Sequence, residues 1–192
     1  MISPPDEGLA ALAARLRALR PRCGPVRLVG IDGHAGSGKS TLAARLARAL
    51  GGAPVVHLDD LASHASFFGW TEAFEVQVLG PLSRGREARY RVYDWERRRF
   101  GSEEAVGPAP VVLVEGVGAG RRALRPRLSF LIWLAVPPAV AWARGLRRDG
   151  AELTEFWREW TAAEAGHFAD DPSKPFADIL MRPRGPGYDA CG

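Results

Sequence analysis

The chain lacks asparagine altogether and holds only two cysteines and two lysines among its 192 residues. Without asparagine it cannot carry the N-K-x-D pattern that reads guanine, so a GTPase switch is disfavoured. The cysteines, Cys23 and Cys191, stand near opposite ends of the chain, and neither belongs to a C-x-x-C or Cys/His pattern. The sequence therefore predicts neither a disulfide framework nor a zinc site.

Long apolar runs are missing as well. The longest, FLIWLAV from Phe130, is far shorter than the ~20 residues of a membrane helix, and no signal-peptide pattern opens the chain. With 46% hydrophobic residues the chain can nevertheless bury a full core. We expect a soluble, cytoplasmic protein without a membrane partner, built as a single domain over 1–192 with a helix within 1–24.

The positive charge is spread along the chain. The net charge is +4, and the 24 arginines form several separate clusters. A nucleic-acid-binding surface gathers its cations on one face or stripe, so we expect no nucleic-acid partner.

One stretch has a clear chemical meaning. From Gly33 the sequence reads GHAGSGKST, with the spacing G-x-x-x-x-G-K-[ST] of a phosphate-binding loop. Its glycines let backbone N–H groups converge on a polyphosphate, Lys39 reaches the β- and γ-phosphates, and the Ser40 hydroxyl ligates Mg²⁺. A strand pattern precedes the loop and a helical pattern follows it. We expect a nucleoside triphosphate to be held by Gly33, His34, Ala35, Gly36, Ser37, Gly38, Lys39, Ser40 and Thr41.

Strand and helix patterns alternate along the chain, which predicts an α/β doubly wound fold. Between about 61 and 108 the sequence shows no regular pattern and predicts a long irregular region. The expected strands are 26–32, 54–60, 111–116, 130–136 and 177–181. The expected helices are 138–149, 152–168 and the one within 33–50, a range that also includes the phosphate-binding loop.

Acidic residues end two of these strands, where ligands bind in such sheets. Glu115 follows four apolar residues, and a carboxylate there can hold Mg²⁺ directly or through water. Either Asp59 or Asp60 can act as the base that removes a proton from an acceptor hydroxyl, while the other caps the next helix.

Arginines follow on the predicted helix 138–149. Arg144 and Arg148 are four residues apart and share one face of it. They can clamp the phosphoryl group during transfer, although cations also collect at helix C-termini because of the helix dipole.

Behind GHAGSGKST, the segments VVHLDD, YRVYDWERR, VVLVEG and ARGLRRD follow in an order that resembles the uridine kinase and phosphoribulokinase group of P-loop kinases, especially its short actinobacterial members. The resemblance covers roughly 26 to 181. It implies a three-layer P-loop NTPase fold with a mostly parallel five-stranded sheet and a small lid. It also implies ATP with Mg²⁺ as the donor and a hydroxyl of a small molecule as the acceptor.

The resemblance implies roles for single residues too. Asp59 matches the catalytic base and Asp60 the second position of the same motif. Tyr93, Asp94 and Trp95 match an acceptor-site motif within an insertion at 61–108. Arg144 and Arg148 match arginines of the lid, which together with the helix after it covers 144–168.

The chain departs from the group near the acceptor. Leu61 and Ala62 follow the aspartates where Phe and Tyr are common, and the lid lacks a further arginine-containing segment. Arg98 stands where pyrimidine nucleoside kinases have a base-reading histidine. A guanidinium offers only donors, so we expect Arg98 to bind acceptor oxygens and to make cytidine a poor substrate.

Three functions stay open on the sequence alone. The chain is a uridine or cytidine kinase, a kinase for another small-molecule acceptor, or a non-catalytic ATP-binding module that acts through a protein partner. The carboxylate at Asp59 favours a kinase, because a pure binding module needs no base there. The sequence leaves the oligomeric state open.

Overall fold

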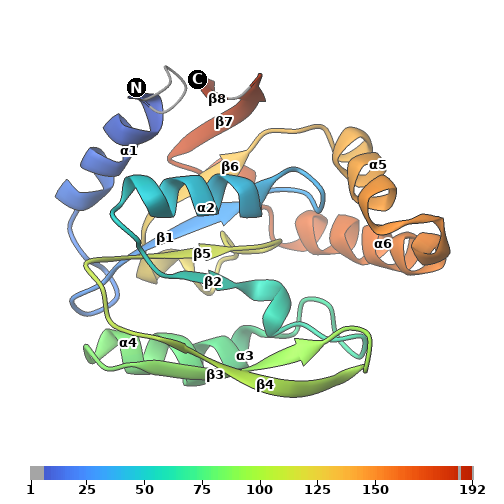
Figure 1. Cartoon of the computed structure of the whole chain (residues 1–192), viewed down its shortest axis with the longest axis horizontal. Coiled ribbons are helices and arrows are strands. Elements are labelled where there is room, and N and C mark those ends of the chain that lie inside the picture. The colour runs from blue at the N-terminus through green and yellow to red at the C-terminus, as the bar shows by residue number, and fades with distance from the viewer. Residues whose placement is uncertain (1–6, 186, 192) are drawn as a thin grey trace.

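The chain is built around one six-stranded sheet. The computed structural model describes residues 7–185 and 187–191. The predicted α/β class and mostly parallel sheet are confirmed: five neighbouring strands run parallel, and a sixth, antiparallel strand adds to one edge (Figure 1). In spatial order the strands are β2 (Val55–His57), β5 (Val111–Glu115), β1 (Arg27–Asp32), β6 (Leu128–Leu134), β7 (Ile179–Arg184) and β8 (Gly187–Cys191).

Helices cover both faces of this sheet, because its inner strands are apolar on both sides. From β1, Val29 and Ile31 pack with Leu42 in a core beneath α1 (Glu7–Ala18) and α2 (Lys39–Ala49). Leu28 points the opposite way, into a second core that contains Phe74. The alternation along β1 therefore produces a three-layer arrangement (Figure 1).

The region 61–108 differs from the expectation of irregular chain. It contains a helical segment formed by α3 (Thr71–Phe74), a π-helical turn (Glu75–Leu79) and α4 (Gly80–Ser83), followed by a hairpin of β3 (Ala88–Asp94) and β4 (Arg99–Val106). The sequence did not predict this helical segment because it contains Gly80 and Pro81, and glycine and proline usually interrupt helices. The β4 strand is exposed at all but one residue, so it lacks an alternating apolar pattern.

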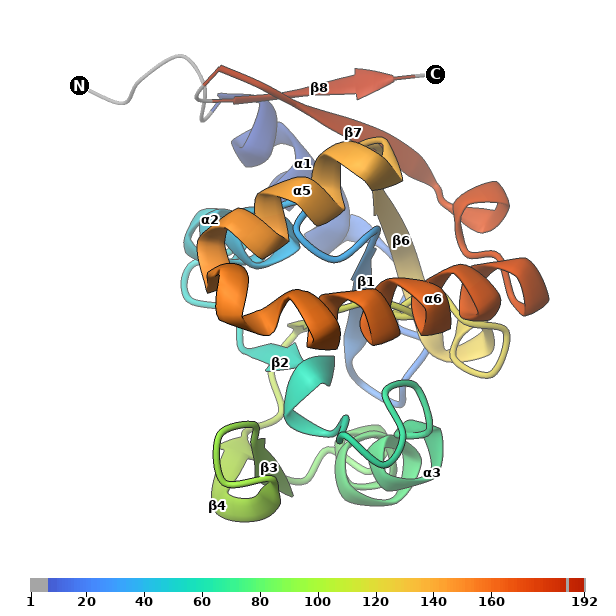
Figure 2. The ribbon, with the colours of Figure 1, turned by 90° about the vertical axis from the view of Figure 1, so that its right-hand side faces the viewer.

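Two helices cross the end of the sheet where the parallel strands finish (Figure 2). These are α5 (Pro138–Asp149) and α6 (Thr154–Asp170), close to the predicted ranges, joined through Gly150 and a short 3-10 turn (Ala151–Leu153). Gly145 of α5 faces the indole of Trp157 in α6, and a Cβ at Gly145 would overlap that ring. Within 7–185 and 187–191, no helix is long and apolar enough to cross a membrane.

We expect Gly145→Ala to destabilise the fold by ~1–3 kcal/mol, because the added methyl group forces the buried Trp157 ring or α5 to move. The free energy of unfolding in urea measures this. Gly166→Ala in α6 is the matched control, since its Cβ would meet no atom within 4 Å. Replacing an exposed glycine within a helix by alanine stabilises the protein by up to about 1 kcal/mol. Equal stability changes in both variants would contradict the packing argument.

Candidate active site

The predicted phosphate-binding loop connects β1 to α2. Gly36 has a left-handed backbone (φ 79°), and a Cβ there would overlap the carbonyl oxygen of Ala141 in α5. Gly38 is also left-handed (φ 100°) and directly precedes the first residue of α2. The loop therefore curls as tightly as its glycines suggested, and its outer side packs against α5.

Lys39 and Ser40 begin α2 and face the carboxyl end of the sheet. The Lys39 side chain is buried, and its Nζ donates a hydrogen bond to the carbonyl oxygen of His34 at 3.0 Å. The Ser40 hydroxyl donates to Glu115 at 3.0 Å. The structure thus brings together the lysine, the hydroxyl and the carboxylate that the sequence assigned to a triphosphate and its metal.

Glu115 is a buried carboxylate held in its ionised form. Burial opposes ionisation, but hydrogen bonds from His57, at 2.5 Å, and Ser40 and the charge of Lys39 outweigh it, so the pKa of Glu115 is lowered. The same contact raises the pKa of His57. The described residues contain no cluster of three or more His, Cys, Asp or Glu suited to a metal. Mg²⁺ typically takes only one or two protein oxygens besides phosphates and water, so the Ser40–Glu115 pair fits it.

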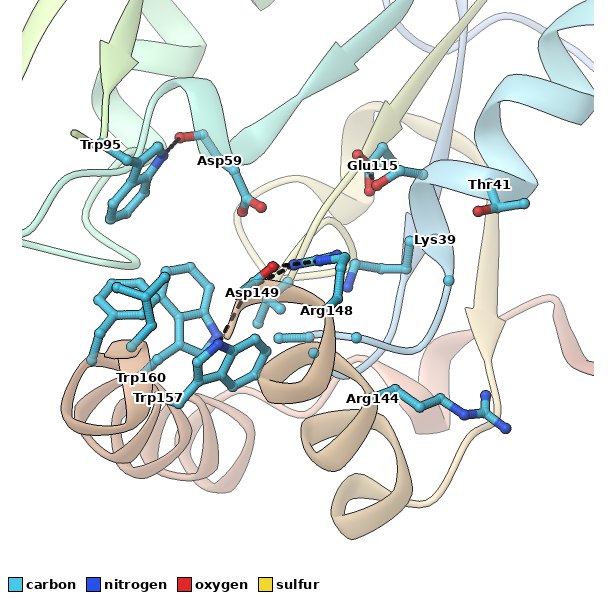
Figure 3. Close-up of a pocket in the computed structure, with 18 of the residues that line it drawn as sticks. Lys39, Thr41, Asp59, Trp95, Glu115, Arg144, Arg148, Asp149, Trp157 and Trp160 are labelled. Carbon is cyan, nitrogen blue, oxygen red and sulfur yellow. Dashed lines mark hydrogen bonds and ion pairs between the residues drawn. The ribbon is translucent and has the colours of Figure 1, made fainter. Parts of the chain in front are cut away.

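Asp59 and Asp60 do not end a strand, since β2 stops at His57, but lie in a 3-10 turn (Leu58–Asp60). The Asp59 side chain faces a cavity of about 580 Å³ that Lys39 and Glu115 also line (Figure 3). Limited solvation inside this cavity and the negative charge of Glu115 raise the pKa of Asp59 to about 6, against the opposing charge of Lys39.

Asp60 faces elsewhere. It accepts a hydrogen bond from the Tyr90 hydroxyl at 3.4 Å and lines a separate cavity of about 490 Å³ beside the β3–β4 hairpin. The pair Asp59–Asp60 is therefore divided between two cavities, and only Asp59 lies in the one that the phosphate-binding loop lines.

The two predicted lid arginines lie in α5 and point in different directions. Arg148 is paired with Asp149, with Nε–Oδ1 at 2.6 Å and Nη2–Oδ2 at 3.0 Å. Trp157 donates its indole N–H to the same carboxylate at 3.1 Å. Arg144 also lines the cavity, but Figure 3 shows its guanidinium directed away from Lys39 and Asp59.

Of the residues predicted to bind the acceptor, some line the cavity and others do not. Trp95 lines the cavity and donates its indole N–H to the main-chain oxygen of Asp59 at 3.3 Å. Tyr93 does not line the cavity, but it shares a 3.0 Å hydrogen bond with His64, which does. Asp94 is bonded to Arg97 within the hairpin turn. Arg98 is exposed in that turn, and the structure does not bring it to the cavity.

Apart from Trp95, an aromatic wall of the cavity was not predicted from the sequence. His64 lines the cavity, and its ring centroid lies 5.0 Å from that of Trp95 and 5.8 Å from that of Phe156. Burial lowers the pKa of His64, and the nearby charge of Arg98 acts in the same direction. The segment FWREW at 156–160 was the available signal, because its aromatic residues recur on one helix face. The wall consists of His64, Trp95, Phe156, Trp157 and Trp160.

Comparisons with known proteins agree with this geometry. A uridine kinase from Chloroflexus aurantiacus is 24% identical over 178 residues, which cover 80% of this chain and 85% of the relative. A uridine kinase from Borrelia hermsii is 23% identical over 177 residues, covering 81% and 86%. No protein-family model matches the chain. A solved structure described as a possible uridine kinase from Bacillus stearothermophilus has a TM-score of 0.65 at 21% identity, covering 91% of this chain and 97% of that one.

The chain is thus a distant relative of proteins named uridine kinase, and its fold matches that of P-loop kinase structures. The resemblance read from its motifs is confirmed at this level. The structural likeness to the Bacillus protein supports the P-loop kinase fold.

Lys39→Ala is expected to weaken binding of Mg-ADP by at least ~10-fold and to abolish ATP turnover, because the buried cation of the predicted phosphate-binding loop is lost. Isothermal titration calorimetry measures the affinity. Lys174→Ala removes the only other lysine, which is exposed, and should bind as the unaltered protein does. Unchanged binding by Lys39→Ala would refute the assignment of the loop.

Proposed function

We propose that the chain is an ATP-dependent kinase that transfers the γ-phosphoryl group of ATP to a hydroxyl of a small molecule. The observation that carries this proposal is the position of Asp59. Its carboxylate faces the same cavity as the phosphate-binding residues Lys39 and Ser40, and its pKa of about 6 suits a base at neutral pH.

In this reaction the acceptor hydroxyl approaches the γ-phosphorus from the side of Asp59. The hydroxyl proton passes to the Asp59 carboxylate while the acceptor oxygen forms a bond to phosphorus. The bond between the γ-phosphorus and the β,γ-bridging oxygen breaks, and ADP leaves with the electron pair of that bond. Lys39 offsets the charge on the terminal phosphates, and Arg148, held by Asp149 beside the cavity, offers a second cation.

Ser40 and Glu115 are the residues that would hold Mg²⁺, which supplies charge neutralisation on the phosphate oxygens. His57 orients Glu115 through its 2.5 Å hydrogen bond. In the described part of the chain Glu115 thus has two partners that fix its carboxylate toward the start of α2.

The acceptor lies, in this proposal, against the aromatic wall. Flat or apolar groups pack well on indole and phenyl rings, and Asp59 beside Trp95 sets where the reacting hydroxyl must stand. Relatives named uridine kinase make a nucleoside the first acceptor to test. We assign the acceptor contacts to Trp95 and His64 rather than to Arg98, because only the first two line the cavity.

Asp59→Asn should slow acceptor-dependent ADP release by ~10²-fold or more, because an amide cannot take up the hydroxyl proton. Binding of Mg-ADP should persist. The rate is measured with a panel of nucleosides, sugars and cofactor precursors. Asp60→Asn is the matched comparison and should have the smaller effect, since Asp60 faces the other cavity. A larger loss of rate in Asp60→Asn would show that Asp60, not Asp59, is the base. ADP release at the same rate with and without every acceptor would favour an ATP-binding module.

Trp95→Ala should raise the KM for the acceptor by about tenfold and the KM for ATP by less than about twofold, because the Trp95 ring lies beside Asp59 and apart from Lys39 (Figure 3). Steady-state kinetics with the best acceptor of the panel measures both constants. Arg98→Ala separates the two assignments of the acceptor site. If Arg98→Ala raises the acceptor KM and Trp95→Ala does not, the hairpin turn closes over the acceptor and the aromatic wall does not bind it.

A further inference from the structure

Glu164 of α6 is a fully buried carboxylate that touches neither the cavity nor the solvent. It accepts hydrogen bonds from four N–H groups. The donors are the Nδ1 of His34 at 2.7 Å, the main-chain N–H of Ala35 at 2.9 Å, and the indole N–H groups of Trp142 at 2.9 Å and Trp160 at 3.3 Å. Two of these donors belong to the phosphate-binding loop, one to α5 and one to α6.

These bonds keep Glu164 ionised. Burial alone would raise its pKa, but the hydrogen bonds from His34, Ala35 and Trp142 outweigh burial and lower it. An ionised carboxylate only accepts hydrogen bonds, so the Nδ1 of His34 carries the hydrogen between the two groups. A buried charge with this many donors is costly to replace, because each orphaned N–H group loses its partner.

His34 is fixed on its other sides as well. Its ring meets the rings of Trp133 from β6, Trp142 from α5 and Phe168 from α6 edge to face, with centroid distances of 5.5, 5.9 and 5.3 Å. The side chain thus points away from the phosphate-binding interior of the loop. The carbonyl oxygen of the same residue accepts the hydrogen bond from Lys39.

We propose that Glu164 is a positioning residue of the nucleotide site, which acts through His34 to set the carbonyl that holds the Lys39 ammonium. Glu164 binds the His34 ring, the ring orients the backbone of His34, and that backbone orients Lys39. The bond to Ala35 fixes the next peptide of the loop in the same way. Through Trp142 and Glu164, helices α5 and α6 are therefore joined to the phosphate-binding loop.

Glu164 also reaches the aromatic wall through Trp160, whose ring lines the cavity. The Glu164 carboxylate thus connects the phosphate-binding loop to a ring of the proposed acceptor site. This inference rests on the proposed function only as far as nucleotide binding.

The test is the affinity for Mg-ADP of Glu164→Gln, a change that keeps the size of the side chain but replaces one acceptor oxygen by a donor. We expect the Kd, measured by calorimetry, to rise about tenfold, as is usual when a group that orients a binding residue is lost. Glu159→Gln is the matched control, because it makes the same change at an exposed position of the same helix. Its Kd should stay within about twofold of the unaltered protein.

A double-variant cycle separates positioning from a general loss of structure. If Glu164 acts through His34, the Glu164→Gln change should weaken binding much less in a His34→Ala background than alone. Urea unfolding shows that each variant is folded at the temperature of the titration. If Glu164→Gln does not fold, His34→Ala alone must raise the Kd by about tenfold.

Three results would overturn the proposal: a folded Glu164→Gln variant that binds Mg-ADP as the unaltered protein does, losses that simply multiply in the double variant, or, where Glu164→Gln is unfolded, normal binding by His34→Ala. If the unaltered protein itself fails to bind Mg-ADP, the proposed kinase function is refuted instead. The two failures are therefore distinguishable.

Discussion

The burial of one cation, the Lys39 ammonium, is the constraint on which the rest of the site depends. Lys39 is only 8% exposed, and a buried charge needs polar partners. The loop around its ammonium group provides one, the carbonyl oxygen of His34. This loop curls tightly because glycines adopt left-handed backbone conformations within it. The parallel strand before it and the helix after it keep the loop at the carboxyl edge of the sheet, where Figures 1 and 2 place α5 and α6.

Around this cation the carboxylates have distinct environments. Glu115 is buried and bonded to Ser40 and His57, so it stays ionised and suits a metal. Asp59 opens to the cavity and has no such close side-chain donors among the described residues, so the surrounding protein and the charge of Glu115 raise its pKa to about 6. Carboxylates whose environments push their pKa values apart are typical of sites that divide metal binding from proton transfer.

Much of the donor site could be predicted from the sequence. The β1–loop–α2 unit, the Ser40–Glu115 pair and the parallel sheet follow from local patterns, because each is a short segment whose residue spacing sets its backbone. The helical segment at 71–83 could not, since Gly80 and Pro81 disfavour a helix locally, whereas packing of Phe74 and its neighbours against the sheet stabilises it. Which of Asp59 and Asp60 faces the phosphate-binding loop also could not be read from the sequence. The two are adjacent residues of a tight turn, and their side chains point to different sides.

The sequence by itself determined the phosphate-binding loop, because the backbone N–H groups of one continuous loop recognise phosphate and consecutive residues set their spacing. Only the tertiary structure decided which side chains form the wall of the proposed acceptor site. There, Trp95 from the hairpin and Trp160 from α6 meet across a long stretch of sequence, and the turn geometry leaves Arg98 exposed. The same holds for Glu164, which lies 130 positions from His34. Side-chain contacts of this kind depend on how helices pack on the sheet, and no local pattern encodes that packing.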